Sequence, residues 1–433
     1  MDGGRLLSAV LAVVVCVPTG SAAEEAAVPG QWLQWRGPDR RDISPDKGLR
    51  KDWDADPPQL VWKAEGLGSG YAGISLGGGR IFSMGDVESQ QVVVALDAQD
   101  GRLLWRTPIS DKSAHSYPGA RCTPTIDGQH LYVVGSNGDI ACLQAQDGAL
   151  VWQKNFQKEW DGRMMSGWGY AESPLVDGDR VICTPGGAKA MMVALDKRTG
   201  AQIWQSPADV PGDAGRDGAG YASSVISHGG GVKQYVQLTG RGLIGVRAAD
   251  GKLLWSYNPI ANTTANIPTP LIDGDHVFAS TGYQTGAVLL RLSPDGRGGV
   301  TAREQYFLDA KTLQNHHGGM VLLGDFIYCG HGHNNGFPIC VRMSTGKVVW
   351  GGDRRGPGSS SAAVTLADGH LVFRYQSGEV ALIEATPQGY QLKGSFTPDY
   401  VSEPSWAHPV VIGGKLYLRE QDQLMCYDVR QRS

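Results

Sequence analysis

Histidine is concentrated in one short segment of this chain. Of the ten histidines in the sequence, four lie within residues 315–336, NHHGGMVLLGDFIYCGHGHNNG, as His316, His317, His331 and His333. Imidazole nitrogens bind zinc and copper, and they also exchange protons near neutral pH. The segment could therefore form a metal site, a catalytic cluster or the polar rim of a structural element. The choice depends on the fold that positions it.

A repeated motif indicates what that fold is. A small residue, five variable residues, glycine, three variable residues and tryptophan recur at intervals of about 50 residues. A tight Asp-Gly or Gly-Gly turn between alternating β-rich runs precedes each copy and predicts a hairpin. Each repeat is therefore predicted to form four antiparallel strands, named A to D, and the whole chain an all-β, eight-bladed β-propeller. Full copies of the motif lie at 95–105, 142–152, 194–204, 245–255 and 340–350.

The last repeat predicts how the ring closes. Residues 408–429 supply only three strands. We expect the N-terminal strand at 59–64, QLVWKA, to pair with them as the fourth, because an unpaired strand edge would otherwise stay exposed. The predicted organisation is a signal peptide at 1–23, an N-terminal arm at 24–58 and the propeller at 59–433.

The tryptophan that ends each motif is predicted to be structural. The small residue ten positions earlier leaves room for the flat ring, and the glycine four positions earlier suits a turn with positive φ. Losing one such ring should cost about 3–5 kcal/mol of stability. Cysteines occupy several of the small positions, so they are expected to be buried thiols rather than disulfides. The predicted docking residues are Trp62, Trp105, Trp152, Trp204, Trp255 and Trp350.

The N-terminal residues and the net charge indicate where the protein is located and which partners it does not bind. Arg5, the apolar run LLSAVLAVVVCV and the small residues TGSAA form a signal-peptide pattern, and Val15 before Cys16 does not fit a lipoprotein cleavage site. A periplasmic or secreted protein is therefore expected. No later apolar run is long enough to span a bilayer. The net charge of −4, without basic blocks, argues against nucleic acid as a partner.

The motif resembles the quinoprotein-type propeller repeat, Ala-x-Asp-x-x-x-Gly-x-x-x-Trp, which 95–105 and 194–204 match fully. The segment QWLQWRGPDRRDIS at 31–44 is similar to the start of exported planctomycete proteins that carry this repeat. The resemblance implies a propeller but leaves the function open. The repeat occurs in quinone-dependent alcohol dehydrogenases and also in BamB-like propeller lipoproteins, which are non-enzymatic parts of the outer-membrane assembly machinery.

The features that the resemblance associates with catalysis are missing from the sequence. The similar enzymes hold pyrroloquinoline quinone (PQQ) between a tryptophan and a disulfide of adjacent cysteines, with a calcium ion and an aspartate base. This chain has no adjacent cysteines and no Cys-x-x-Cys-His haem motif. No catalytic residue is therefore assigned. No cofactor is expected, with PQQ or a metal ion as the alternatives.

Strand parity predicts where a site would lie. The D–A and B–C connections of all blades emerge on one face, and they are longer and more irregular than the A–B and C–D turns. Irregular loops on a rigid scaffold are where function concentrates. If Leu323-Gly324 is the A–B turn of the histidine-rich blade, His316 faces His331 across the hairpin. His333 then lies beside this pair, and His317 points away.

The same pairing argument extends the candidate site to other blades. A Gly413-Gly414 turn places His408 opposite Arg419, and Glu172 takes an equivalent inner-strand position. The cluster is a polar rim, a ligand pocket without metal, or a metal site held by His316, His331 and His333. The predicted ligand-binding residues are Glu172, His316, His331, His333, Asn334, Trp406, His408, Arg419 and Glu420.

These inferences favour one function and leave one alternative. The favoured function is an exported binding or scaffold propeller that recognises a protein, peptide or carbohydrate on the face bearing the D–A and B–C loops. The alternative is a PQQ-dependent or other oxidoreductase with its site at the mouth of the channel.

Overall fold

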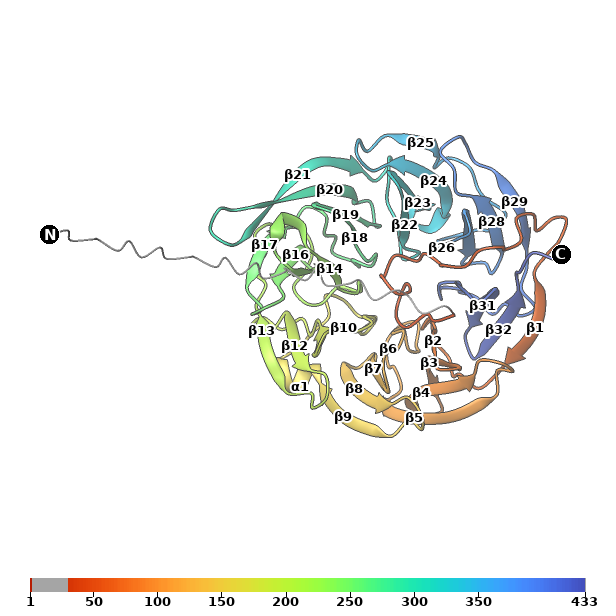
Figure 1. Cartoon of the computed structure of the whole chain (residues 1–433), viewed down its shortest axis with the longest axis horizontal. Helices are drawn as coiled ribbons and strands as arrows, with labels where there is room; N and C mark the ends of the chain where they lie inside the picture. Colours follow the sequence, from red (N-terminus) through yellow and green to blue (C-terminus); the bar gives the residue numbers. More distant parts are fainter. Residues whose placement is uncertain (2–29, 433) are drawn as a thin grey trace.

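The chain forms a closed ring of eight sheets around a central channel. In the computed structural model, which describes residues 1 and 30–432, each sheet contains four antiparallel strands. Figure 1 shows the sheets arranged radially, with strand A of a blade near the axis and strand D at the rim. The predicted all-β, eight-bladed β-propeller is confirmed. The predicted signal peptide at 1–23 lies, from residue 2 onward, outside the described residues.

Blades one to four follow one another along the chain, and each is a continuous meander of strands A to D. Their strands are β2 (Ser75–Gly77), β3 (Arg80–Val87), β4 (Gln90–Asp97) and β5 (Leu103–Asp111); β6 (Thr125–Asp127), β7 (His130–Val134), β8 (Asp139–Gln144) and β9 (Leu150–Asn155); β10 (Leu175–Asp177), β11 (Arg180–Cys183), β12 (Met192–Asp196) and β13 (Gln202–Ser206); and β14 (Val225–Ser227), β15 (Gln234–Thr239), β16 (Gly242–Arg247) and β17 (Leu253–Tyr257).

Blades five to seven repeat this arrangement, and blade eight takes only its first three strands from the C-terminus. Their strands are β18 (Leu271–Asp273), β19 (His276–Thr281), β20 (Gly286–Pro294) and β21 (Val300–Asp309); β22 (Met320–Leu323), β23 (Phe326–His331), β24 (Phe337–Arg342) and β25 (Val348–Gly351); β26 (Ala362–Ala367), β27 (His370–Tyr375), β28 (Val380–Glu384) and β29 (Leu392–Phe396); and β30 (Val410–Ile412), β31 (Lys415–Glu420) and β32 (Gln423–Asp428).

Helical structure is limited to short turns in the connections. None of the helices in the described part of the chain is long and apolar enough to cross a membrane. The helical segments are α1 (Phe156–Trp160) and the 3-10 turns η1 (Gly229–Gly231) and η2 (His333–Asn335).

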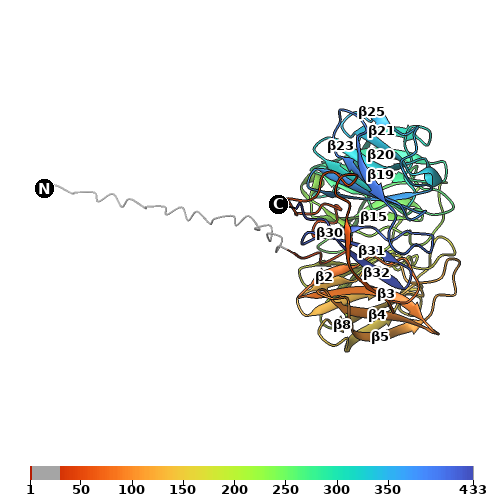
Figure 2. The same cartoon turned by 90° about the vertical axis from the view of Figure 1, so that its right-hand side faces the viewer.

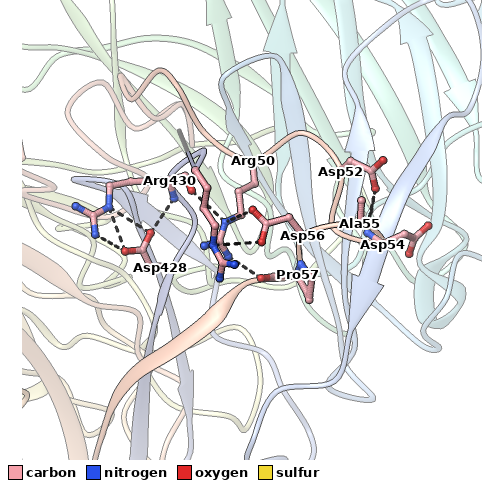
Figure 3. Close-up of polar contacts among 9 residues, drawn as sticks. Arg50, Asp52, Asp54, Ala55, Asp56, Pro57, Asp428 and Arg430 are labelled. Atoms are coloured by element: carbon pink, nitrogen blue, oxygen red, sulfur yellow. Dashed lines mark hydrogen bonds and ion pairs between the residues drawn. The ribbon is translucent and has the colours of Figure 1, made fainter.

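The ring is closed by β1 (Gln59–Ala64), as predicted. This strand pairs antiparallel with β32 as the outer strand of blade eight, with Trp62 opposite Cys426. Figure 3 shows the contacts that fasten the arm to the C-terminus beside this closure. Arg50 donates to the carbonyl oxygen of Arg430 at 3.0 Å and forms an ion pair with Asp56 at 3.1 Å.

The motif tryptophans pack between neighbouring blades. Trp152 lies opposite Cys142, the small residue of its own motif. Its ring also covers the motif glycine of the next blade, since a Cβ on Gly200 would lie 2.8 Å from Trp152. Its indole N–H donates to the carbonyl oxygen of Lys197 in that blade at 3.0 Å. The glycine therefore serves the contact between blades as well as the turn, a role that the sequence pattern alone does not indicate.

Two of the predicted docking tryptophans use other partners. The indole N–H of Trp255 donates to Gln234 Oε1 in its own blade at 2.6 Å. Trp350 donates to the carbonyl oxygen of Thr386 in blade seven at 2.7 Å. The hydrogen bond of Trp255 therefore stays within its own sheet, whereas that of Trp350 connects two blades.

The cysteines of the described chain are buried free thiols, as predicted. Burial raises the pKa of Cys142 to about 12, so its reactive thiolate form is suppressed. They therefore act as small apolar residues. These cysteines are Cys122, Cys142, Cys183, Cys329, Cys340 and Cys426.

Gly200→Ala is expected to destabilise the protein by about 2–3 kcal/mol, measured by denaturant unfolding. The backbone at Gly200 has φ of +71°, and an added Cβ would press on the Trp152 ring. Gly178→Ala is the matched control, because Gly178 has φ of +59° in an A–B turn but nothing within 4 Å of the added Cβ. Gly178→Ala should lose only the stability that the strained left-handed backbone costs, about 1 kcal/mol. Equal losses in both variants would contradict interblade docking.

The N-terminal arm crosses the channel on the face of the A–B turns. Trp32 pairs with Leu76 at the end of β2, and Ile43 pairs in parallel with Leu366 at the end of β26. Between these points the buried guanidinium of Arg40 donates to backbone carbonyls of blades three and four. The arm, red in Figure 1 and also visible in the edge-on view of Figure 2, therefore connects opposite sides of the ring.

Candidate functional site

A cavity of about 340 Å³ lies at the mouth of the channel, among the D–A and B–C connections. Its floor includes Trp35 and Arg36 of the arm, which reach it from the opposite face. Five predicted ligand-binding residues line the cavity, and Glu172, His331, Arg419 and Glu420 do not. The five are His316, His333, Asn334, Trp406 and His408.

Aromatic rings form a continuous arc along one side of the cavity. The Trp406 ring lies 4.7 Å from Tyr71 and 5.0 Å from Tyr117, measured between ring centroids. The arc continues from Trp406 to His317 at 5.2 Å. On the far side, Trp168 and Tyr221 pack with centroids 6.0 Å apart. Planar side chains held at these separations offer faces on which a ring-shaped ligand can stack.

The predicted His316–His331 pair is wrong, because the hairpin turns one residue later than expected. Leu323 pairs with Phe326, so the two-residue turn is Gly324-Asp325 and the register shifts by two. His316 instead meets His333, with ring centroids 4.1 Å apart.

His331 and His317 also differ from expectation. His331 Nδ1 accepts from the backbone N–H of Gln314 at 3.2 Å, and the residue does not line the cavity. His317 was expected to point away from His316, but its ring lies 4.5 Å from that of His316 and lines the cavity. Strand alternation does not apply here, because β22 begins only at Met320. The histidines at the mouth are therefore His316, His317 and His333.

Arg419 and Glu420 have structural roles rather than cavity positions. Arg419 is buried and donates to the carbonyl oxygen of Gly68 at 2.9 Å and to Ser83 Oγ at 2.6 Å, which connects blade eight to blade one. Glu420 forms a fully buried ion pair with Arg374.

Glu172 is likewise buried outside the cavity. Its carboxylate accepts from the backbone N–H of Thr184 at 2.6 Å and from Gln237 Nε2 at 3.1 Å. Burial raises the pKa of Glu172 to about 7. These contacts join blades three and four, and they leave the carboxylate no position at the channel mouth.

The cavity is free of acidic side chains and carries basic ones. Among the residues of the described chain that line it, there is no aspartate or glutamate. Burial lowers the pKa of His316 far below its usual range, and it lowers the pKa of His317 to about 3, so both rings are neutral near pH 7. Arg121 lines the cavity and donates only to backbone carbonyl oxygens, at distances from 2.6 to 3.3 Å. The fixed charge at the cavity surface is therefore positive.

Acid is expected to destabilise the protein through His317. Between pH 6.5 and about 3 the unfolded chain binds a proton that the buried ring excludes, so stability falls as pH falls below 6.5. His317→Gln should reduce this dependence by up to about 1 kcal/mol per pH unit, measured as unfolding free energy at pH 7, 6 and 5. His228→Gln, at an exposed position, is the control and should leave the slope unchanged. An unchanged slope in His317→Gln would contradict the burial of a neutral ring.

The side chains at the mouth do not fit a metal centre. Within residues 1 and 30–432, no group of three or more histidine, cysteine, aspartate or glutamate side chains is placed to hold a metal ion. The predicted set of His316, His331 and His333 is not assembled, because His331 does not line the cavity and its Nδ1 accepts from the backbone N–H of Gln314. Calcium prefers oxygen ligands, which carboxylates usually supply, and the lining residues contain none. The calcium and aspartate that accompany PQQ in the similar enzymes therefore have no counterpart in this cavity.

Neither the contribution of the arm to the cavity nor any aromatic lining residue except Trp406 and the histidines was predicted from the sequence. Trp35 and Arg36 fall in the segment used only for its resemblance, WRGPDRRDIS, where a tryptophan next to three arginines could have suggested a buried role. The remaining aromatic residues lie in irregular loops without periodic signal. Those from the loops are Tyr71, Tyr117, Trp168, Tyr221 and Tyr283.

The eight four-stranded blades and the Ala-x-Asp-x-x-x-Gly-x-x-x-Trp motif define a quinoprotein-type repeat propeller. A family model described as "Outer membrane protein assembly factor BamB" matches residues 51–159 and 89–352, and the chain belongs to this family. Proteins of that name from Shewanella oneidensis and Nitrosomonas eutropha are 26% and 23% identical, over 51% and 70% of this chain. The matches cover 56% and 68% of those relatives, and 39% of the one from Yersinia pestis, so the chain spans about half the length of the curated relatives it matches.

Solved structures agree on the fold. BamB from Moraxella catarrhalis superimposes with a TM-score of 0.61 and 14% identity, covering 87% of this chain and 99% of that one. The quinohemoprotein alcohol dehydrogenase of Comamonas testosteroni gives 0.63 and 12%, covering 95% and 82%. At these identities the likeness establishes the propeller and carries no function with it.

Proposed function

We propose that this protein is an exported binding propeller without catalytic activity of its own, and that a segment of a protein, peptide or carbohydrate partner enters the cavity at the channel mouth. The observation that carries the proposal is the arc of aromatic rings around a 340 Å³ cavity on a rigid scaffold. Such concave aromatic surfaces supply large contact areas at little entropic cost. Membership of a family named for an outer membrane assembly factor supports a partner-binding role.

The chemistry of the cavity favours binding over proton transfer. A general base works best when its pKa lies near the operating pH. Burial lowers the pKa of His316 and His317 well below that range. Among the described residues that line the cavity, there is no carboxylate to raise these pKa values. The imidazoles are better suited to hydrogen bonding, since a neutral ring offers one donor and one acceptor.

The proposal includes the organisation of the chain and its location. The segment at 1–23 directs export, and the mature protein acts in the periplasm or outside the cell. The arm at 24–58 and the propeller at 59–433 then form one binding unit, because Trp35 and Arg36 of the arm complete the cavity floor.

A comparison of two faces tests this function. Immobilised wild-type protein, Trp406→Ala and Leu323→Arg are each exposed to a cell-envelope extract of the host, and retained proteins and sugars are identified by mass spectrometry. Trp406 lines the cavity, whereas Leu323 lies at an A–B turn on the opposite face and is 38% exposed. Partners should be lost with Trp406→Ala and kept with Leu323→Arg. The reverse pattern would contradict the proposal.

Quinone titration separates this function from the oxidoreductase alternative. Wild-type protein is titrated with PQQ and followed by absorbance, and the mixture is assayed for dye reduction with alcohols and sugars. No saturable binding at micromolar quinone and no dye reduction are expected. Saturable quinone binding together with dye reduction would establish an enzyme instead.

A further inference from the structure

We propose that the cavity binds a sugar ring that carries a carboxylate, as in the uronic acid units of an acidic glycan. This inference rests on the proposed binding function and names the chemical class of the ligand. It follows from three properties of the cavity: its charge, its flat aromatic faces and the polar groups between them.

The charge of the cavity selects an anionic ligand. Arg121 lies among the lining residues, yet within the described chain its guanidinium donates to backbone carbonyl oxygens and to no carboxylate. Its charge is held over the Tyr71 ring at 5.5 Å, and burial lowers its pKa, which reports the cost of keeping this cation out of water. A ligand carboxylate would supply the missing counter-charge, and charge-assisted hydrogen bonds of this kind are among the strongest in proteins.

A second guanidinium lies at the floor. Arg36 is 2% exposed; its Nε donates to Asp42 at 2.6 Å and its Nη2 to the carbonyl oxygen of Met320, while Nη1 has no partner in the described chain. The two ring nitrogens of His317, which also lines the cavity, are likewise without partners. Buried donors and acceptors are normally paired. An occupant of the cavity that presents oxygen atoms would supply partners for them.

The aromatic residues select a ring with flat apolar faces. Trp406 stands between Tyr71 and His317, with centroid separations of 4.7 and 5.2 Å, and Tyr117 on the rim is 52% exposed. The C–H faces of a sugar ring pack against such platforms, while its hydroxyl groups point outward in the plane of the ring.

The polar groups between the platforms favour a sugar over an aromatic acid. Amide and imidazole groups occur around the cavity, including Asn334, Gln376 and His333. The indole N–H of Trp406 donates to the amide oxygen of Gln376 at 2.8 Å, so the amide N–H groups are the remaining donors of Gln376. An aromatic acid carries polar groups only at its ends and would leave the groups along its edges unpaired, at a cost. A sugar presents hydroxyls on all sides, and the 340 Å³ volume suits one or two rings.

Calorimetric titration of the purified protein tests the inference. The probes are digalacturonic acid, the neutral disaccharide of the same linkage, and 4-hydroxybenzoate as an aromatic acid without sugar. Wild-type protein should bind the acidic disaccharide saturably and the neutral one at least about tenfold more weakly. Arg121→Gln should remove this preference, and Arg121→Lys should keep it because the charge is retained. Arg297→Gln, at an exposed position in the β20–β21 loop, should behave as wild type.

Each other result overturns the inference. The inference is overturned if the neutral disaccharide binds as tightly as the acidic one, or if 4-hydroxybenzoate binds more tightly. It is also overturned if Arg121→Gln keeps the preference for the acidic disaccharide at an unchanged melting temperature. Should Arg121→Gln unfold its own loop, the comparison of the two disaccharides on wild-type protein and Arg121→Lys still decides the point. Failure of the disaccharide while Trp406→Ala still loses its envelope partners would reject the acidic sugar and leave the binding function in place.

Discussion

Glu420→Ala is expected to lower the free energy of unfolding by about 3–5 kcal/mol, because it leaves the Arg374 guanidinium buried without a counter-charge. Both side chains of this ion pair are 0% exposed, and the carboxylate also accepts from the backbone N–H of Ser402 at 3.2 Å. Urea unfolding of wild type and variant measures the loss. The double variant with Arg374→Met and Glu420→Leu should recover most of it, since an apolar pair of similar volume does not carry the desolvation penalty.

A surface pair provides the control for this experiment. Glu384 and Lys393 are bonded at 2.8 Å, with 36% and 31% of their side chains exposed. Glu384→Ala should therefore change stability by less than about 1 kcal/mol. If Glu420→Ala changes the unfolding free energy by a similarly small amount but abolishes partner binding, the structural role is contradicted. Glu420 would then count as a ligand-binding residue.

Arg40→Met is expected to destabilise the protein by about 3 kcal/mol and to free the N-terminal arm. The guanidinium of Arg40 donates to the carbonyl oxygens of Ser173 at 3.1 Å and Ser224 at 2.9 Å, and to that of Pro174. Methionine fills a similar volume but leaves these buried acceptors unpaired, and each such group costs about 1–3 kcal/mol. The melting temperature and the rate of tryptic cleavage within 31–50 measure the two effects.

The neighbouring arginine serves as the control, because Arg41 is exposed. Arg41→Met should keep both the melting temperature and the resistance of the arm. The Arg40 variant should also lose binding at the mouth, since Trp35 and Arg36 of the same arm form the cavity floor. An arm that stays protected in Arg40→Met would show that other contacts hold it.

The propeller could be predicted because its determinants are local and repeated. The small residue, the glycine and the tryptophan of each motif recur at fixed spacing, and each has a physical reason that does not depend on distant residues. The closing strand β1 was predictable for the same reason. No small residue lies ten positions before Trp62, and no tryptophan follows Cys426, so each can serve as the partner of the other. The contact of Trp152 with Gly200 of the next blade was not, because no pattern within one repeat reports on its neighbour.

The candidate site could be predicted only in part. Parity correctly separates the two sets of connections, and the cavity lies among the D–A and B–C loops. The neighbour of His316 was missed for two reasons: the turn lies one residue later than expected, and His316 precedes β22, so strand register does not fix its position. Arg419 and Glu420 were placed at the mouth because the Gly413-Gly414 turn pairs Arg419 with His408, whereas both side chains are buried with partners in neighbouring blades. The arm has no repeat, so its passage across the channel left no periodic signal.

Photo-crosslinking tests the central claim, that the partner binds at the aromatic mouth of the channel, most directly. A benzophenone amino acid is placed at position 117, where Tyr117 is 52% exposed on the cavity rim, or at position 323, where Leu323 is 38% exposed at an A–B turn. After irradiation in the native host, position 117 should form a covalent adduct that Trp406→Ala abolishes, and position 323 should form none with the same partner. An adduct of that partner from position 323 alone would contradict the account.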